Sequence, residues 1–329
     1  MASATLWRQK AYALLGIGAF LAGVPFVTNE YVLHVMILIL FSVVLSQAWN
    51  LLGGFAGQFS LGHAAFFGLA AYTSTLAFIW YGISPWLGMF AGAGLAVASS
   101  LLIGSLCFRL RGPFFSLITI AFGEALRLVF LNWGSLTGGP VGLLVPLMRD
   151  SPWDFQFQSR QPYYYVILCM ALGVVYAAYR IRNSQLGLCF IAIREDEDAA
   201  ESLGINAFRY KLIALAISVF FTALAGTFYA QYILYLHPDS VMSLNFSIEI
   251  ALPAIVGGMG TIWGPIIGSI LLTPLSELTR AILGGSYAGV YLIMHGAILV
   301  LIVLFMPNGV AHAITTRIHP AKNTRNEKR

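Results

Sequence analysis

The amino-acid sequence predicts an all-α polytopic membrane protein that crosses the bilayer about ten times. Hydrophobic residues make up 59% of the 329-residue chain, and charged residues make up only 9%. Apolar runs long enough to cross about 30 Å of hydrocarbon recur along almost the whole length. Lysine and arginine also collect in alternate connections between these runs. We predict spans at 11–27, 31–52, 60–80, 86–108, 113–131, 163–180, 210–232, 247–257, 264–283 and 288–306.

The basic residues predict which side of the bilayer each connection faces, because lysine and arginine in short connections are retained in the cytoplasm. With the N-terminus inside, most of the 18 basic residues face the cytoplasm, and the C-terminus lies there too. This parity requires the short segment 247–257 to cross the membrane, or an equivalent re-entrant pair to replace it. The net charge of +5 is therefore an orientation signal, and we expect no nucleic-acid partner. The cytoplasmic groups are 8–10, 109–111, 180–211 and 317–329.

The N-terminal segment has the look of a signal peptide, because Arg8 and Lys10 precede an apolar run from Ala11 to Val24. No small-x-small cleavage site follows at the right place, and removing the run would invert the predicted topology. We therefore expect this run to be the first span.

Two glycine clusters interrupt the apolar runs, one at 53–63 and one at 257–265. Irregular backbone at membrane depth survives only where protein or a watery cavity satisfies it, so both clusters predict broken or re-entrant helices. Two such breaks in corresponding halves point to a transport site at the repeat interface. The alternative is that these glycines permit tight helix contacts at the inner surface. His63 also has two interpretations, a path residue or a hydrogen-bonded packing residue.

Glu124 and Arg127 are ionisable residues within a predicted span, where charge is expensive. Their i, i+3 spacing places both on one helical face, where they can neutralise each other. Two interpretations stay open, a structural ion pair that holds two helices and a polar lining of the translocation path. The candidate path residues are Gly57, Gln58, Ser60, Gly62, His63, Glu124, Arg127, Gly257, Gly258, Gly260 and Thr261.

The segment 194–204 is the densest charge cluster in the chain. Its run of acids suits the first turn of a helix, where the macrodipole is positive, and Gly204 suits the left-handed position after the helix ends. Ala199, Ala200 and Leu203 fall at adjacent helical spacings, which predicts a short helix with a small-residue face. The alternative is a solvated loop.

The longest external connection, at about 132–162, shows no obvious secondary structure in its sequence. A loop of this length is typically a lid or a binding surface.

Catalytic and metal-binding motifs are missing from the sequence. It has no G-x-x-x-x-G-K-[ST] phosphate loop, so we expect no ATP hydrolysis by this chain through that machinery. It also lacks a His-Glu-x-x-His motif and a nucleophile elbow. Cys107, Cys169 and Cys189 lie in predicted spans or at their inner edges, which supports no disulfide framework and no metal site. We predict no cofactor and no enzymatic activity.

Four motifs in order carry a family resemblance. The chain reads Gly-Gln-Phe-Ser-Leu-Gly-His-Ala-Ala-Phe-Phe-Gly at 57–68, Arg-Leu-Arg-Gly-Pro-Phe-Phe at 109–115, Arg-Glu-Asp-Glu-Asp-Ala-Ala at 194–200 and Gly-Gly-Met-Gly-Thr at 257–261. Over about 35–310, this sequence resembles the M-type permease of branched-chain amino-acid ABC importers.

The resemblance implies that the helix near 195–203 is the coupling helix that docks on an ATPase subunit. General ABC permeases follow this helix with an Ile-x-Leu-Pro motif, whereas here the chain reads Ala-Leu-Ala-Ile at 214–217, without proline. This departure fits the branched-chain subgroup. The coupling residues would be Arg194, Glu195, Asp198, Ala199, Ala200, Leu203 and Gly204.

The resemblance further implies a multi-pass subunit of the cell (inner) membrane. It would be paired with an H-type permease, two ABC ATPase subunits and a periplasmic or extracellular substrate-binding protein. Residues 1–310 would form the permease domain and 311–329 a basic cytoplasmic tail. Urea, short amides and other amino acids stay open as substrates. The rival classes are an ion-coupled secondary transporter, with Glu124 or Glu249 as proton carrier, and a membrane scaffold without transport.

Overall fold

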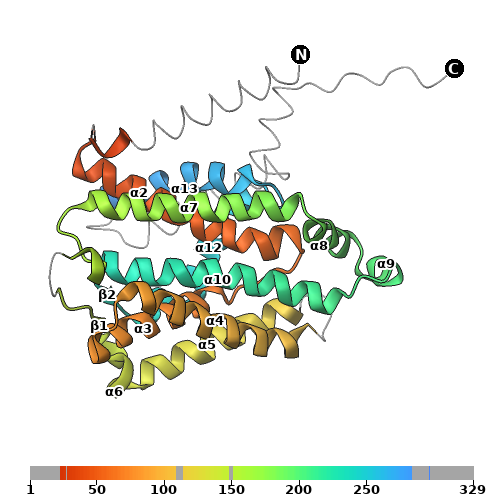
Figure 1. Ribbon diagram of the computed structural model, residues 1–329, viewed down its shortest axis with the longest axis horizontal. Coiled ribbons are helices and arrows are strands. Elements are labelled where there is room, and N and C mark those ends of the chain that lie inside the picture. The colour runs from red at the N-terminus through yellow and green to blue at the C-terminus, as the bar shows by residue number, and fades with distance from the viewer. Residues whose placement is uncertain (1–22, 27, 109–113, 148–150, 284–295, 297–329) are drawn as a thin grey trace, which may run out of the picture.

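The computed structural model describes residues 23–26, 28–108, 114–147, 151–283 and 296, and its long helices form one bundle (Figure 1). Within these residues, seven segments are long and apolar enough to cross a membrane, so the chain is a polytopic all-α membrane protein. The long helices are α2 (Glu30–Asn50), α3 (His63–Tyr81), α4 (Pro85–Cys107), α5 (Phe114–Asn132), α7 (Arg160–Arg182), α10 (Ala207–Ile233), α12 (Leu244–Gly257) and α13 (Trp263–Leu283).

Helix α10 lies between two groups of helices (Figure 1). It packs on α3 and α4 on one side and on α2 on the other, where α2 also contacts α7, α12 and α13. Small residues allow close approach, as membrane helices require. A Cβ atom at Gly226 of α10 would lie 2.3 Å from the carbonyl oxygen of Phe67 of α3. The backbones of α3 and α10 are therefore in direct contact.

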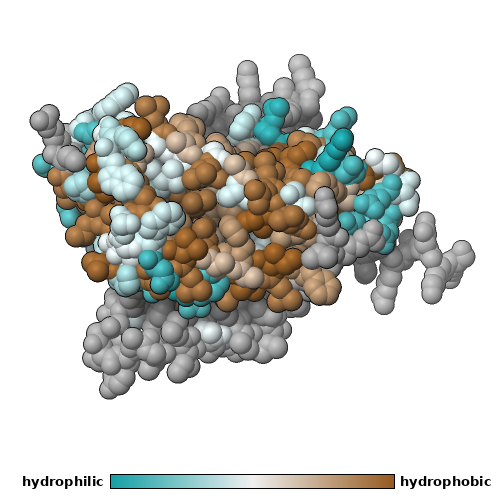
Figure 2. Space-filling view, turned by 90° about the horizontal axis from the view of Figure 1, so that it is seen from below, coloured by the Kyte–Doolittle hydropathy of each residue, from teal (hydrophilic) through white to brown (hydrophobic). Residues whose placement is uncertain are grey.

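The two ends of the bundle carry different short elements (Figure 1). One end holds α8 (Gln185–Glu195) and α9 (Glu197–Ser202), which connect α7 to α10. Hydrophobic side chains dominate the face shown in Figure 2, and hydrophilic ones gather toward its ends, including the end with α8 and α9. The opposite end holds α6 (Gly134–Thr137), η2 (Gly139–Val141), β1 (Leu143–Leu144), η3 (Pro152–Asp154), β2 (Tyr235–Leu236) and α11 (Pro238–Val241).

The connection 132–162 is more ordered than the sequence predicts. Strand β1 pairs antiparallel with β2, with Leu143 opposite Leu236. The indole nitrogen of Trp86 donates to the carbonyl oxygen of Pro152 at 2.8 Å, and its ring stacks on the buried Phe155 ring at 4.2 Å between centroids. The predicted absence of secondary structure is therefore wrong, because long-range pairing supplies order that local sequence does not show. Its use as a lid stays a prediction.

The predicted spans within the described residues coincide with helices, and several differ from them in their bounds by a few residues or more. The third begins at His63 instead of residue 60, because the backbone before it is irregular. The eighth is longer than predicted, since Pro238–Gly257, comprising α11 and α12, is a candidate span. Helix α13 occupies the predicted ninth span. The predicted first and tenth spans fall almost entirely outside the described residues, as do the basic groups 109–111 and 317–329.

Candidate functional site at the two broken helices

The first break lies between α2 and α3. Helix α2 widens into a π-helix, η1 (Leu51–Phe55), and the chain is then irregular until His63. Gly57 adopts a φ of +69°, in the left-handed region that favours glycine. The backbone is irregular within the predicted cluster, although not at its first glycines, and a broken helix at membrane depth stays a prediction. Gly53 and Gly54 stay helical, and a Cβ at Gly53 would lie 2.5 Å from the Trp49 ring, so tight packing explains them.

The second break lies between α12 and α13. Gly257 ends α12, and Gly258 and Gly260 follow with φ values of +122° and +73°. The Thr261 hydroxyl donates to the Gly258 carbonyl at 2.8 Å and accepts from the backbone N–H of Gly264 at 2.9 Å. Thr261 therefore bridges the two sides of the break and provides an acceptor for an amide in the first turn of α13.

The two breaks meet through the side chain of Asn50. Its Nδ2 donates to the Thr261 carbonyl at 2.8 Å, and its Oδ1 accepts from the Gly260 N–H at 2.9 Å. Asn50 is fully buried at the end of α2. Sequence analysis missed this residue, although a polar amide at the end of a long apolar run, just before a glycine cluster, is a usable signal.

The predicted helix at 194–204 is two helices, so its predicted start is wrong. Arg194 and Glu195 end α8, and α9 begins at Glu197. Between them Asp196 is extended, and its carboxylate accepts from the Ala199 N–H at 3.0 Å, which makes it the N-cap of α9. The acids of the first turn then face the positive end of the helix dipole, as expected. Gly204 follows with a left-handed φ of +86°, as predicted.

The predicted common face of Ala199, Ala200 and Leu203 is also wrong. Ala200 is buried in a small cluster with Ile193 and Ala207, whereas Ala199 is exposed and Leu203 is 82% exposed. The i, i+4 spacing of Ala199 and Leu203 puts these two on the outer side of α9. We call them the outer face of α9.

Two polar contacts tie α8 and α9 to the bundle. The Nη1 atom of Arg194 donates to the Gly54 carbonyl at 2.9 Å, next to the first break. The ammonium group of Lys211 on α10 lies 2.6 Å from the Glu197 carboxylate on α9. The Lys211 side chain is only 3% exposed, so this ion pair is shielded from solvent. Sequence analysis counted Lys211 among the loop cations and missed its partner.

His63 is fully buried at the start of α3. Its ring nitrogens lie 3.1 Å from the Ser60 hydroxyl and 2.8 Å from the Ser218 hydroxyl, and Ser218 donates to the Ala48 carbonyl at 2.7 Å. Ser60 is buried as well. In this conformation both residues have the geometry of hydrogen-bonded packing, and their use in the path stays a prediction.

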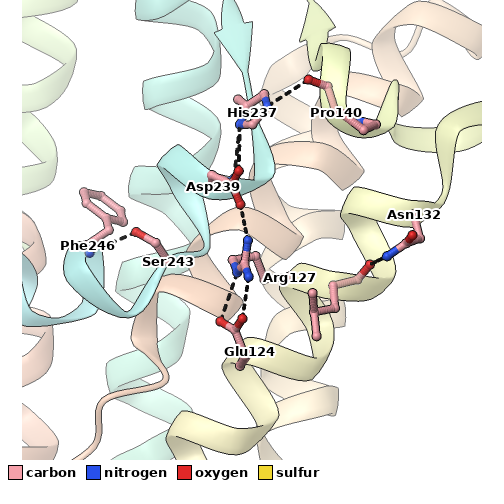
Figure 3. Close-up of polar contacts among 9 residues, drawn as sticks. Glu124, Arg127, Asn132, Pro140, His237, Asp239, Ser243 and Phe246 are labelled. Carbon is pink, nitrogen blue, oxygen red and sulfur yellow. Dashed lines mark hydrogen bonds and ion pairs between the residues drawn. The ribbon is translucent and has the colours of Figure 1, made fainter.

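Glu124 and Arg127 form the predicted ion pair, in the second half of α5 (Figure 3). The Nε of Arg127 donates to Glu124 Oε2 at 2.9 Å, and Nη2 binds Oε1. Asp239 of α11 is a third member, bonded to Nη1 of Arg127, which the sequence analysis missed. His237 precedes it and donates to the Pro140 carbonyl at 3.0 Å, so the cluster joins α5 to the β-strand end.

The structure therefore separates the predicted path residues into two groups. The glycine breaks, with Ser60 and His63, lie together near α8, while Glu124 and Arg127 lie near α11. The described residues contain no group of three His, Cys, Asp or Glu side chains placed to hold a metal ion.

These features define the class of protein, a multi-span membrane protein in which two interruptions between helices lie beside a pair of short helices. Residues 31–304 match the family described as branched-chain amino acid transport system / permease component, and the chain belongs to this family. It is a LivM-like permease subunit.

Named relatives agree with this assignment. The permease LivM of the high-affinity branched-chain amino acid transport system of Escherichia coli is 28% identical, over 92% of this chain and 75% of that protein. The corresponding LivH of Salmonella typhimurium is 24% identical, over 81% of this chain and 90% of that protein. The nucleoside ABC transporter permease NupC of Lactococcus lactis is 26% identical, over 68% of this chain and 72% of that protein. A comparison with solved structures found no significant match.

Proposed function

We propose that this chain is one of two membrane subunits of an ATP-driven importer and forms, with an H-type permease, the path for branched-chain amino acids. The similarity to the LivM proteins over 92% of the chain supports the substrate class. One structural observation carries the ATP-driven mechanism. The helix pair α8–α9 is hydrogen-bonded through Arg194 to η1, next to the break after α2, so a force applied at α9 reaches the membrane helices.

The remaining partners follow from this role. A permease that moves solute by ATP hydrolysis needs two ATPase subunits on the cytoplasmic side, and we place them against the outer face of α9. A periplasmic or extracellular binding protein would deliver the solute at the end that carries β1 and β2. The Lys211–Glu197 ion pair would transmit a movement of α9 to α10 as well.

In the orientation proposed here, α8, α9 and both termini lie in the cytoplasm. The protein lies in the cell membrane, which is the inner membrane in a cell that has two. Arg180 and Arg182 lie in the last turn of α7, and Arg209 lies in the first turn of α10, at the same end of the bundle as α8 and α9 (Figure 1). Basic residues retained on the cytoplasmic side support this orientation.

Reconstitution tests the proposed function. The chain, its H-type permease, both ATPases and the binding protein are placed in proteoliposomes, and accumulation of radiolabelled leucine is measured. We expect uptake only with ATP on the ATPase side. Uptake driven by an imposed proton gradient without nucleotide would show a secondary transporter instead.

Competition then tests the substrate class. Excess isoleucine or valine should abolish labelled leucine uptake, whereas urea, short amides and a nucleoside should not. The nucleoside is a necessary competitor because NupC belongs among the relatives. Displacement by the nucleoside or urea alone would assign the importer to that solute and reject branched-chain amino acids.

Glu124 separates the two transport classes at the level of one residue. Both of its oxygens bind Arg127, so protonation of either oxygen would disrupt one hydrogen bond and weaken the other by removing the negative charge. We expect Glu124→Gln to lower the uptake rate or the yield of assembled complex while uptake stays strictly dependent on ATP. Loss of coupling to ATP in this variant would support the proton-carrier alternative.

A further inference from the structure

Arg194 reaches from the last turn of α8 into the place where the two breaks meet. Its Nη1 donates to the carbonyl oxygen of Gly54 at 2.9 Å. Its Nε and Nη2 donate to the carboxylate of Glu195 at 3.1 and 2.5 Å. The guanidinium therefore holds a backbone oxygen of the first broken helix with one nitrogen and its own helix end with the other two.

Both breaks leave room for this side chain. A Cβ atom at Gly57 would lie 2.7 Å from Cγ of Arg194, and a Cβ atom at Gly260 would lie 2.4 Å from Nη1. Both distances are too short for real contacts, so a larger residue at either position would displace the arginine. Gly54 and Gly260 also touch, since a Cβ at Gly54 would lie 2.5 Å from the Gly260 nitrogen. The arginine thus binds η1 through Gly54 and lies against one glycine of each break, Gly57 and Gly260.

Arg194 is bound at this position but stays partly exposed to solvent. Its side chain is 34% exposed, and it lines a cleft of about 460 Å³ together with Gly57, Phe59, Ser116 and Lys211. Asn50, in contrast, is fully buried and holds the second break from within the bundle. A movement of α8 can therefore withdraw the Arg194 side chain through the cleft. The Asn50 side chain is enclosed by the bundle and cannot leave in this way.

We propose that Arg194 is a positioning residue that pins the two breaks together in this conformation, and that movement of α8 and α9 driven by nucleotide withdraws it and lets the breaks separate. This inference rests on the proposed function, because it requires the ATPases to act on α9. It assigns to one side chain the mechanical link between the nucleotide-driven helix pair and the two broken spans.

Two variants remove the pin in different ways. Arg194→Met keeps the aliphatic stem and removes the guanidinium, and its control is Arg209→Met, an exposed cation at the same end. Gly57→Ala keeps the guanidinium but drives a Cβ into the Arg194 stem. Its control is Gly82→Ala, because Gly82 has a similar φ of +61° and no atom within 4 Å of its Cβ position. Arg194→Lys keeps a positively charged donor for the Gly54 carbonyl but lacks the several nitrogens of the guanidinium group.

The readouts separate coupling from folding. ATPase co-purification and basal ATP hydrolysis report assembly, and leucine uptake reports transport. Spin labels at Phe59→Cys and Met259→Cys, in a background without the native cysteines, report the distance between the breaks with and without trapped nucleotide. Both target residues are partly exposed.

In complexes that contain the ATPases, we expect Arg194→Met and Gly57→Ala to lose at least about tenfold in leucine uptake per complex. Their label distance should no longer respond to nucleotide, both controls should behave as the wild type, and Arg194→Lys should recover part of the uptake. Wild-type uptake together with a wild-type distance response in either Arg194→Met or Gly57→Ala would overturn the inference. If Arg194→Met fails to assemble, the result for Gly57→Ala alone tests the inference. A wild-type complex without ATP-dependent uptake would instead overturn the proposed function.

Discussion

At the scale of single residues, the contacts that organise the two ends of the bundle come from groups far apart in the sequence. Asn50 binds Gly260 and Thr261, which lie 210 and 211 positions away, and Asp239 binds Arg127 across 112 positions. The pair Glu124–Arg127 was predictable because its i, i+3 spacing is local. Its third member was not, since no local pattern connects a residue of α11 with one of α5.

Lys211 gives the sharpest prediction at this scale. Its side chain is 3% exposed and depends on Glu197, which is 27% exposed. Glu197→Gln leaves the ammonium group with a weaker neutral partner in a shielded place, which we expect to cost about 1–3 kcal/mol of stability. Thermal unfolding of the detergent-solubilised protein measures the loss.

The matched control for this prediction is the double variant Glu197→Gln with Lys211→Met. Replacing both members of a buried pair removes the unsatisfied charge, so its unfolding midpoint should recover toward the wild type. A double variant as unstable as the sum of both single variants would show that the two groups do not act as a pair.

At the scale of helices, composition and glycine clustering predicted which segments exist, while tertiary contacts decided where they begin and end. Both glycine clusters coincide with interruptions between helices, while their depth in the membrane stays a prediction. The division of 194–204 into α8 and α9 was not predicted, because it depends on the extended backbone and capping carboxylate of Asp196. The burial of Ala200 and exposure of Leu203 likewise depend on how α9 packs on Ile193 and Ala207.

The packing of α12 on α13 provides a prediction about elements. A Cβ atom at Gly268 of α13 would lie 1.9 Å from the carbonyl oxygen of Pro253 on α12. Gly268→Ala should force the helices apart and destabilise the protein by about 1–3 kcal/mol. Gly94→Ala on α4 is the control, because no atom lies within 4 Å of its Cβ position and alanine favours a helix.

Thermal unfolding distinguishes the outcomes of this comparison. Gly94→Ala should leave the midpoint unchanged or raise it, while Gly268→Ala should lower it and loosen the second break next to it. Equal midpoints for the two variants would mean that α12 and α13 approach less closely than the structure shows.

At the scale of the whole molecule, the all-α membrane architecture could be predicted from apolar runs alone, and seven candidate spans support it. The orientation followed from the basic residues and stays a proposal. What sequence reasoning could not supply is the connection between the proposed docking helix and the breaks. That connection arises only when α8, α2 and α12 are brought together through Arg194, Asn50 and Gly260.

Contact between α9 and the ATPases is the central claim, and site-specific photo-crosslinking tests it most directly. A photoreactive amino acid is placed at Leu203, which is 82% exposed on the outer face of α9, or at Leu144, which is 73% exposed at the opposite end. In the assembled complex, we expect the probe at 203 to crosslink to an ATPase subunit and the probe at 144 never to do so. ATPase crosslinks from 144, or none from 203 in a complex that contains the ATPases, would contradict the account.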